Sequence, residues 1–174
     1  MAEKVINDIL EIDDIDKSII QIIQKEPNLS HEQIAKKVRR SQPTVGSRIK
    51  KLKEAGVFMY QAGINLKTAN LLLARAEIET TNQQAIEELV RKCPFMINAF
   101  ILSGNSNISV LLVSFDLNHL DRIINFHFRK NLEVKSVIME IITNVTNDYV
   151  VPFNLNFEEC EWYLERNCFS THMD

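Results

Sequence analysis

The spacing of apolar residues along the chain changes near residue 60, and this change most limits which folds the chain can adopt. Before that point, apolar residues recur at helical spacing, as in Ile15, Ile19, Ile22 and Ile23. After it, strand-like and helical segments alternate in the order β-α-β-β-α-β over residues 71–145. That order is typical of a ferredoxin-like sheet with two helices on one face. The sequence therefore predicts an α+β protein with a helical N-terminal domain and a ferredoxin-like second domain.

Three short helices are predicted within residues 13–58. Ser30 and Gln33 form a capping-box pattern at the start of the second helix. Ser41 can cap the third helix, which has a proline in its first turn. A buried stripe is expected at i, i+4 and i+7 of this third helix, formed by Val45, Ile49 and Leu52.

Basic side chains are concentrated in the second and third of these helices. The formal net charge is −3 overall, but it is +2 for residues 1–58 and −5 for residues 59–174, and residues 36–53 carry eight Lys and Arg and no acid. One basic element in an acidic protein is typical of polyanion binding. Two helices joined by a tight turn, the second one polar and basic at its start, indicate a helix-turn-helix that enters the major groove of DNA. The alternative interpretation is a small helical bundle with a solvated charged face.

We expect the outward side of the third helix to contact DNA. Its amide, hydroxyl and guanidinium groups suit base edges and phosphates, whereas the neighbouring lysines suit phosphates. Gly46 is unfavourable inside a helix and is expected to permit close approach of the backbone to the duplex. The predicted DNA-binding residues are Lys36, Lys37, Arg40, Ser41, Gln42, Pro43, Thr44, Ser47, Arg48, Lys50 and Lys51.

The predicted sheet of the second domain needs a partner. Its helices cover one face, so Val110, Leu112 and their neighbours are expected on a face that the sheet of a second copy would cover, giving a homodimer or a larger oligomer. A hairpin is expected around Gly104, and residues 151–157 are expected to add a short edge strand. The expected domains are 1–58 for DNA binding, 59–67 as a linker, 68–157 as the ferredoxin-like domain and 158–174 as a helical tail.

The sequence carries no pattern typical of catalysis, and we expect no cofactor and no metal. It contains no combination of nucleophile, base and acid at recognisable spacing and no Gly-rich phosphate loop. His119 and His127 are expected to be packing or solvated side chains. Cys160, Cys168 and His172 in the tail are expected to be packing residues, with a redox switch or a metal site as the alternatives.

Composition points to a cytoplasmic protein without a membrane segment. No apolar run approaches the roughly 18 residues of a membrane span. The first residues lack the basic start and apolar block of a signal peptide, and three cysteines in 174 residues are too few for a disulfide scaffold.

Two stretches resemble a known family of DNA-binding proteins. IDDIDKSIIQIIQKEPNLSHEQIAKKV, followed by SQPTVGSRIKKLKEAGV, is similar to the N-terminal domain of the Lrp/AsnC family of transcription regulators. The β-α-β-β-α-β segment looks like the effector-binding and oligomerisation module of that family, the RAM domain. The resemblance implies a winged helix-turn-helix domain, dimers formed through the sheets, and larger rings of dimers. It also implies that Ser41 caps the recognition helix and that Arg48 contacts a phosphate or a base.

Two departures from the family pattern stand out. Arg39 and Arg40 replace the usual Gly-Leu of the turn, so a side chain other than glycine must adopt the turn conformation, and DNA-binding charge is the expected compensation. The Gly-x-x-Asp turn of the family effector site is matched by residues 104–107, where Asn107 replaces the aspartate. The resemblance assigns Ser103, Gly104 and Asn107 to an amino-acid site, and a plain hairpin turn is the alternative.

We therefore expect a sequence-specific regulator of transcription that binds promoter or operator sites in double-stranded DNA and responds to an amino acid or related metabolite. One alternative is an enzyme of the same architecture that decarboxylates tetrapyrroles, for which His127 and Arg129 would be the candidates. The other is an architectural protein that binds DNA with little sequence preference.

Overall fold

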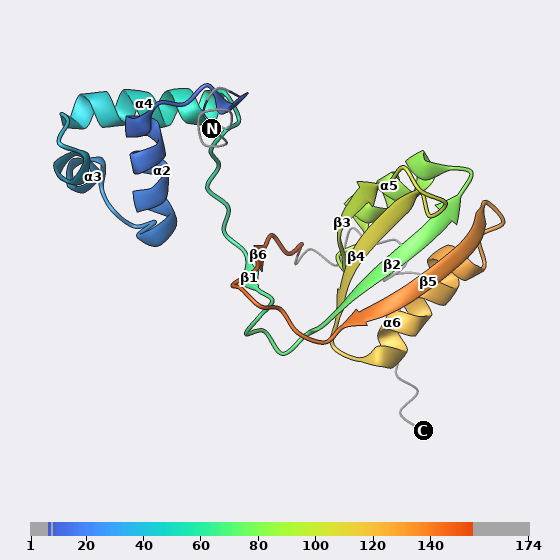
Figure 1. The fold of residues 1–174 in the computed structure, drawn as a ribbon. Helices are drawn as coiled ribbons and strands as arrows, with labels where there is room; N and C mark the ends of the chain where they lie inside the picture. The colour runs from blue at the N-terminus through green and yellow to red at the C-terminus, as the bar shows by residue number, and fades with distance from the viewer. Residues whose placement is uncertain (1–6, 8, 155–174) are drawn as a thin grey trace. The chain divides into compact units, whose positions relative to one another are not determined.

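The computed structural model describes residues 7 and 9–154, which form two compact units divided after Tyr60. The first unit contains helices α2 (Asp14–Lys25), α3 (His31–Val38) and α4 (Gln42–Glu54) (Figure 1). These are the three helices that the sequence predicts.

Side-chain caps determine where these helices begin. The Asp13 carboxylate accepts two backbone N–H groups at the start of α2, at 2.9 and 2.8 Å. At α3, Ser30 Oγ accepts the Gln33 N–H at 3.3 Å and Gln33 Oε1 accepts the Ser30 N–H at 2.8 Å, which confirms the predicted capping box. Ser41 Oγ accepts the Thr44 N–H at 3.3 Å, which confirms the predicted cap of α4.

One apolar core holds the first unit together. Ile19 of α2, Ile34 of α3 and Val45 and Ile49 of α4 are all at most 2% exposed and pack in one cluster. No strand lies within residues 9–60, so the wing of the winged class is not seen in the described part of this unit. The stripe predicted on α4 is confirmed as its buried face.

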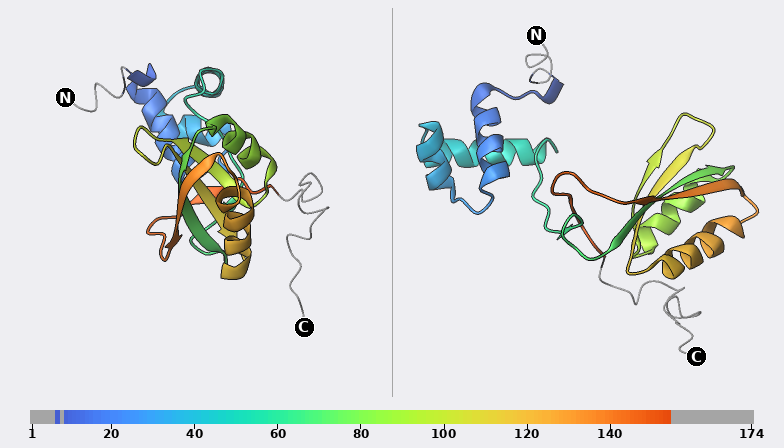
Figure 2. Two further views of the ribbon diagram at one scale, coloured as in Figure 1. Left: turned by 90° about the vertical axis from the view of Figure 1, so that its right-hand side faces the viewer. Right: turned by 60° about the horizontal axis from the view of Figure 1, so that its bottom comes forward.

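The second unit is built on a four-stranded antiparallel sheet. Its strands are β2 (Leu72–Thr80), β3 (Met96–Ile101), β4 (Ile108–Ser114) and β5 (Val134–Ile142), in the spatial order β3-β4-β2-β5. Helices α5 (Gln83–Lys92) and α6 (Leu117–Ile124) lie on one face (Figure 2), and α6 continues into a π-helical turn over Asn125–Arg129. This confirms the predicted ferredoxin-like arrangement.

The main core of this unit lies between the sheet and the two helices. Val110 and Leu112 are fully buried there, against side chains such as Phe128. The expectation that Val110 and Leu112 face away from the helices is therefore wrong. Successive strand residues point to opposite faces, so Leu111 and Val113 occupy the other face instead. β4 is buried along its whole length, so its sequence does not show the alternation of apolar and polar residues that would tell the two faces apart.

A second, smaller sheet packs on that other face. β1 (Ile64–Asn65) pairs with β6 (Val150–Val151), and Leu66 and Val151 join Leu111 in a separate apolar cluster. The segment predicted as a linker therefore contains a strand and a buried leucine. The predicted edge strand is short, and it pairs with β1 rather than with the four-stranded sheet. Residues 155–157 of that prediction lie outside the described residues.

Gly63 lies where the backbone enters this small sheet. A Cβ atom at residue 63 would lie 2.1 Å from the Val151 carbonyl oxygen, so only glycine fits there. The tail residues Cys160, Cys168 and His172 lie outside the described residues. No helix in residues 7 and 9–154 is long and apolar enough to cross a membrane.

Candidate nucleic-acid interface

The turn between α3 and α4 is made by two arginines. Arg39 caps the end of α3 in the left-handed conformation, with φ 53° and ψ 51°. The Arg40 N–H donates to the Ala35 carbonyl at 3.0 Å, and Arg40 Nη1 donates to the Arg39 carbonyl at 3.0 Å. As the sequence predicts, a side chain other than glycine adopts the turn conformation here.

Helix α4 has one buried and one polar face. Opposite the buried stripe, the first half of the helix presents exposed amide and hydroxyl groups. Ser41 Oγ lies 2.7 Å from Thr44 Oγ1, so the cap also orients the threonine hydroxyl. The predicted DNA-binding residues on this exposed side are Ser41, Gln42, Pro43, Thr44, Ser47, Lys50 and Lys51.

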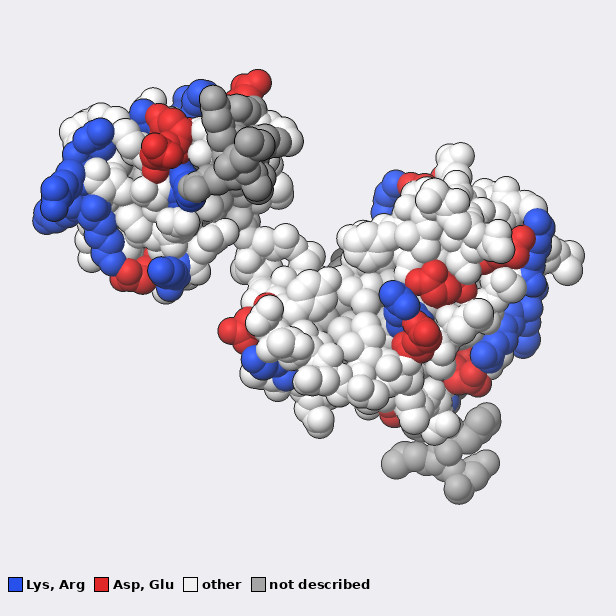
Figure 3. Space-filling view, in the orientation of Figure 1, with Lys and Arg blue, Asp and Glu red and all other residues white. Residues whose placement is uncertain are grey.

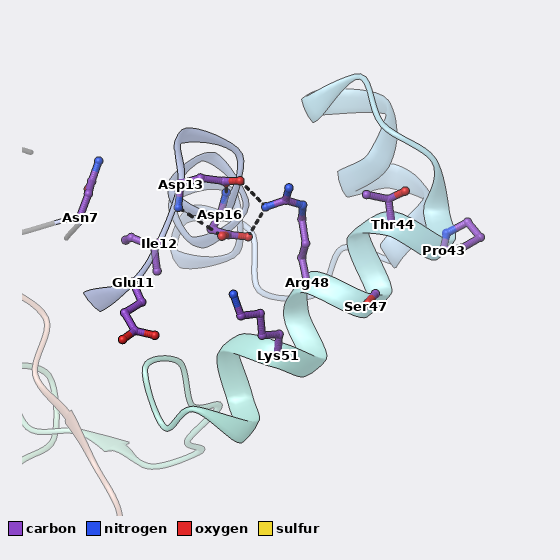
Figure 4. Close-up of a pocket in the computed structure, with 10 residues that line it drawn as sticks. All are labelled: Asn7, Glu11, Ile12, Asp13, Asp16, Pro43, Thr44, Ser47, Arg48 and Lys51. Carbon is purple, nitrogen blue, oxygen red and sulfur yellow. Dashed lines mark hydrogen bonds and ion pairs between the residues drawn. The ribbon is translucent and has the colours of Figure 1, made fainter. Parts of the chain in front are cut away.

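Arg48 differs from the expectation that it projects outward. Its Nη1 atom lies 2.7 Å from Asp13 Oδ2 and 2.8 Å from Asp16 Oδ1 (Figure 4). The Arg48 side chain is 28% exposed and that of Asp16 only 8%. The hydrogen bonds that Arg48 donates to Asp16 and then to Asp13 raise the pKa of Arg48 above its usual value. The pKa of Asp13 is lowered, first by the backbone N–H of Asp16 and further by Arg48.

This ion pair joins α4 to α2. Residues 13 and 16 are 35 and 32 positions from residue 48, so local spacing could not predict the contact. The available signal was an aspartate, Asp16, placed beside an isoleucine stripe and buried with it, because a buried carboxylate requires a partner. Arg48 lines a groove of about 930 Å³ between these helices, together with Thr44 and Ser47.

Several of the predicted phosphate-binding lysines form ion pairs within the unit. Lys36 lies 2.7 Å from Glu32, Lys37 pairs with Glu26, and Lys50 lies 3.7 Å from Glu54. These pairs are exposed, so they contribute little to stability and can open when a stronger anion approaches. Figure 3 shows one group of Lys and Arg side chains over α3 and the turn into α4, with others lying apart from it on the same unit.

Gly46 lies on α4 against another helix of the unit. A Cβ atom there would lie 3.4 Å from His31 Nδ1 at the start of α3. That distance is an ordinary van der Waals contact, so the packing of α3 on α4 does not require glycine at residue 46, and the close approach of the backbone to a duplex stays a prediction.

The residues assigned to an effector site lie at the turn between β3 and β4. Ser103 and Gly104 are exposed. Asn107 is engaged internally, since its Oδ1 accepts the Thr80 N–H at 3.0 Å and its Nδ2 donates to the Thr80 carbonyl at 2.7 Å. The asparagine amide therefore extends the β2–β4 ladder by imitating a backbone pair.

The histidines of the second unit pack against their neighbours and do not form a cluster with one another. His119 is fully buried, its Nδ1 is 2.7 Å from Ser114 Oγ, and its ring stacks on Phe115. Burial lowers the pKa of both His119 and His127 to about 4. Arg129 donates to Asp121 and Asn125, both at 2.9 Å. Nowhere in residues 7 and 9–154 do three His, Cys, Asp or Glu side chains converge as metal ligands do.

Comparison with known proteins agrees with this geometry. Residues 12–58 match the family model described as winged helix-turn-helix DNA-binding. An uncharacterized HTH-type transcriptional regulator from Pyrococcus horikoshii is 28% identical over 141 residues, 78% of this chain and 89% of that protein. A counterpart from Pyrococcus abyssi is 27% identical over the same length.

Solved structures share the fold of both units. Escherichia coli AsnC aligns with a TM-score of 0.70 at 15% identity, covering 80% of this chain and 97% of AsnC. A Neisseria meningitidis transcriptional regulator solved as an L-Met complex aligns with a TM-score of 0.69 at 21% identity, covering 82% and 97%. Bacillus subtilis LrpC gives 0.67 at 19% identity, covering 78% and 97%.

The resemblance drawn from the sequence is thereby confirmed. The helix-turn-helix match, the regulators to which the chain is related and the shared fold agree: the chain is a helix-turn-helix transcriptional regulator with the two-domain fold of the Lrp/AsnC proteins.

Proposed function

We propose that the chain binds operator sites in double-stranded DNA in a sequence-specific manner, with α4 in the major groove. The observation that carries this proposal is the two-sided character of α4. Its stripe of Val45, Ile49 and Leu52 is buried, while its opposite side presents short polar groups near the helix start. A helix that is anchored on one side and polar on the other fits the major groove.

The proposed contacts divide into base readout and phosphate binding. Gln42, Thr44 and Ser47 carry the hydrogen-bonding groups that can distinguish base edges. The phosphate contacts are assigned to Lys36, Lys37, Arg40, Lys50 and Lys51, all exposed in the first unit. Arg48 is assigned a positioning role, because its guanidinium is already held by Asp13 and Asp16.

The second unit is proposed to assemble the DNA-binding protein into a homodimer or larger oligomer. On the sheet face opposite the helices, Ile138 is 61% exposed and lies across from Glu77 in the β2–β5 ladder. Pairing two DNA-binding units on two half-sites multiplies a modest affinity by raising the effective concentration of the second unit.

Amino-acid binding is proposed as the signal that the second unit senses. The Neisseria meningitidis regulator of the same fold was solved with L-Met, which supports a ligand of this class. Ser103 and Gly104 remain candidates for direct contact at the β3–β4 turn. Asn107 is proposed to act indirectly, by holding the turn through its two bonds to Thr80.

The decisive experiment is selection of bound sites from a random pool of duplex DNA by the full-length protein. We expect a short, two-fold symmetric motif that is retained against excess competitor DNA. Titration of the 20 amino acids onto the selected complex then tests the effector. An enriched pool without a motif would contradict sequence-specific binding and favour an architectural role.

A further inference from the structure

Arg39 occupies a backbone conformation that normally carries glycine. At φ 53° and ψ 51° the Cβ atom of an L residue crowds its own carbonyl oxygen. Helices that end in this conformation therefore usually have Gly or Asn at that position. A residue kept in a strained conformation is a reason to look for a function.

No contact within the described structure explains why an arginine is kept there. Arg39 is exposed, and its guanidinium forms no hydrogen bond or ion pair with any residue among 7 and 9–154. The neighbouring lysines differ, since Lys36 and Lys37 each pair with a glutamate. An unpaired cation loses no internal contact when it binds an external anion, so Arg39 is better suited to that role than either lysine.

Arg39 lies close in the chain to the part of the protein that is proposed to contact DNA. It lies two residues before Ser41, the cap at the start of α4. The N-terminal residues of a recognition helix contact base edges, and the backbone phosphates that flank the groove lie beside them. Arg39 and Arg40 therefore place two arginine residues in the turn that leads into the proposed recognition helix.

Resting on the proposed function, we propose that Arg39 is a DNA-phosphate contact and that this contact is what keeps a non-glycine residue in the turn. Arg39 would then favour DNA binding while it destabilises its own turn. This can be tested, because replacing Arg39 with glycine should stabilise the turn and weaken DNA binding at the same time.

The test uses the full-length protein and a fluorescent duplex carrying the selected motif, with anisotropy titrations over a series of salt concentrations. Arg39→Gly removes both charge and strain, Arg39→Asn removes the charge but tolerates the left-handed conformation, and Arg39→Lys keeps the charge. Arg91→Gln is the matched control, because Arg91 is an exposed arginine of the second unit, paired with Glu87.

We expect Arg39→Gly and Arg39→Asn to weaken binding by roughly three- to thirtyfold near physiological salt. The slope of log K against log salt should become shallower by about one unit. Arg39→Lys should stay within about threefold of the wild type, and Arg91→Gln should change neither quantity. The thermal unfolding midpoint of Arg39→Gly should be unchanged or higher.

Two results would overturn the assignment of Arg39 while leaving the proposed function intact. One is wild-type affinity and salt slope in Arg39→Asn. The other is weaker binding in Arg39→Gly accompanied by a lower unfolding midpoint and not recovered in Arg39→Lys, because this would mean a damaged turn. A wild-type protein that does not retain duplex DNA in the selection would instead overturn the proposed function, and the assignment of Arg39 with it.

Discussion

Replacing Arg48 with alanine should destabilise the DNA-binding unit itself. Removing one partner of a fully buried ion pair costs about 3–5 kcal/mol, whereas an exposed pair contributes about 0–1 kcal/mol. Arg48 is 28% exposed and Asp16 is 8% exposed, so the pair lies between these limits. We expect Arg48→Ala to lower the free energy of unfolding of this unit by about 2 kcal/mol, or roughly thirtyfold in the equilibrium constant.

Hydrogen exchange measured by mass spectrometry on the full chain can isolate this effect. Peptides from α2 and α4 should exchange roughly thirtyfold faster in Arg48→Ala, while peptides from β2 and β4 serve as an internal reference. Asp16→Ala should be destabilising as well, and the double variant should lose less than the sum of the two, because neither charge is then left alone. Lys50→Ala, which breaks an exposed pair with Glu54, is the matched control and should stay within about 0.5 kcal/mol.

Wild-type exchange of α2 and α4 in Arg48→Ala would refute the positioning role of Arg48. The dependence on pH gives an independent check. The pKa of Asp13 is lower in the folded state than its ordinary value of 3.8. The contribution of ionised Asp13 to the stability of the fold is therefore complete above pH 3.8 and is lost as the pH falls through the folded-state pKa. The difference between wild type and Arg48→Ala should therefore shrink in acid.

Four other predictions test separate parts of the structure. Thr44→Ala should weaken binding of the selected duplex by roughly tenfold without changing the unfolding midpoint, measured by anisotropy and circular dichroism. Asn107→Asp should destabilise the second unit by about 1–3 kcal/mol at neutral pH, because a carboxylate would face the β2 carbonyl, and stability should recover in acid as the protonated group donates again; equal loss at both pH values would contradict this. Ile138→Glu should lower the oligomer mass in sedimentation experiments, whereas Leu132→Glu, at an equally apolar but fully exposed site, should not. Burial lowers the pKa of His119 to about 4, so wild-type stability should fall as the pH drops from about 6.5 to about 4, and His119→Gln should reduce this pH dependence in chemical denaturation.

The elements that could be predicted are those whose signal is local. The caps at Ser30 and Ser41 and the stripe through Val45 follow from spacing within one helix, so the sequence was sufficient. The β-α-β-β-α-β order was also readable, because each segment has its own period.

The features that could not be predicted depend on distant parts of the chain. The bond between Arg48 and Asp16 and the pairing of β1 with β6 join residues far apart in sequence. Which residues of β4 face the helices could not be predicted, because every residue of β4 is buried. The strand therefore lacks the alternation of apolar and polar residues that shows which side is inward. The role of Asn107 was missed because its partners are backbone atoms of Thr80, which no side-chain pattern reveals.

The small β1–β6 sheet determines how much free chain separates the two units. Because Ile64 is paired with Val151 and Leu66 is buried beside it, the tether of the DNA-binding unit ends near Gly63 rather than at β2. Opening the pair would release residues 64–71 and lengthen the reach of that unit by up to about 26 Å. A longer connection would lower the effective concentration of one DNA-binding unit near another, so in the proposed oligomer these two short strands would affect the strength of binding to paired half-sites.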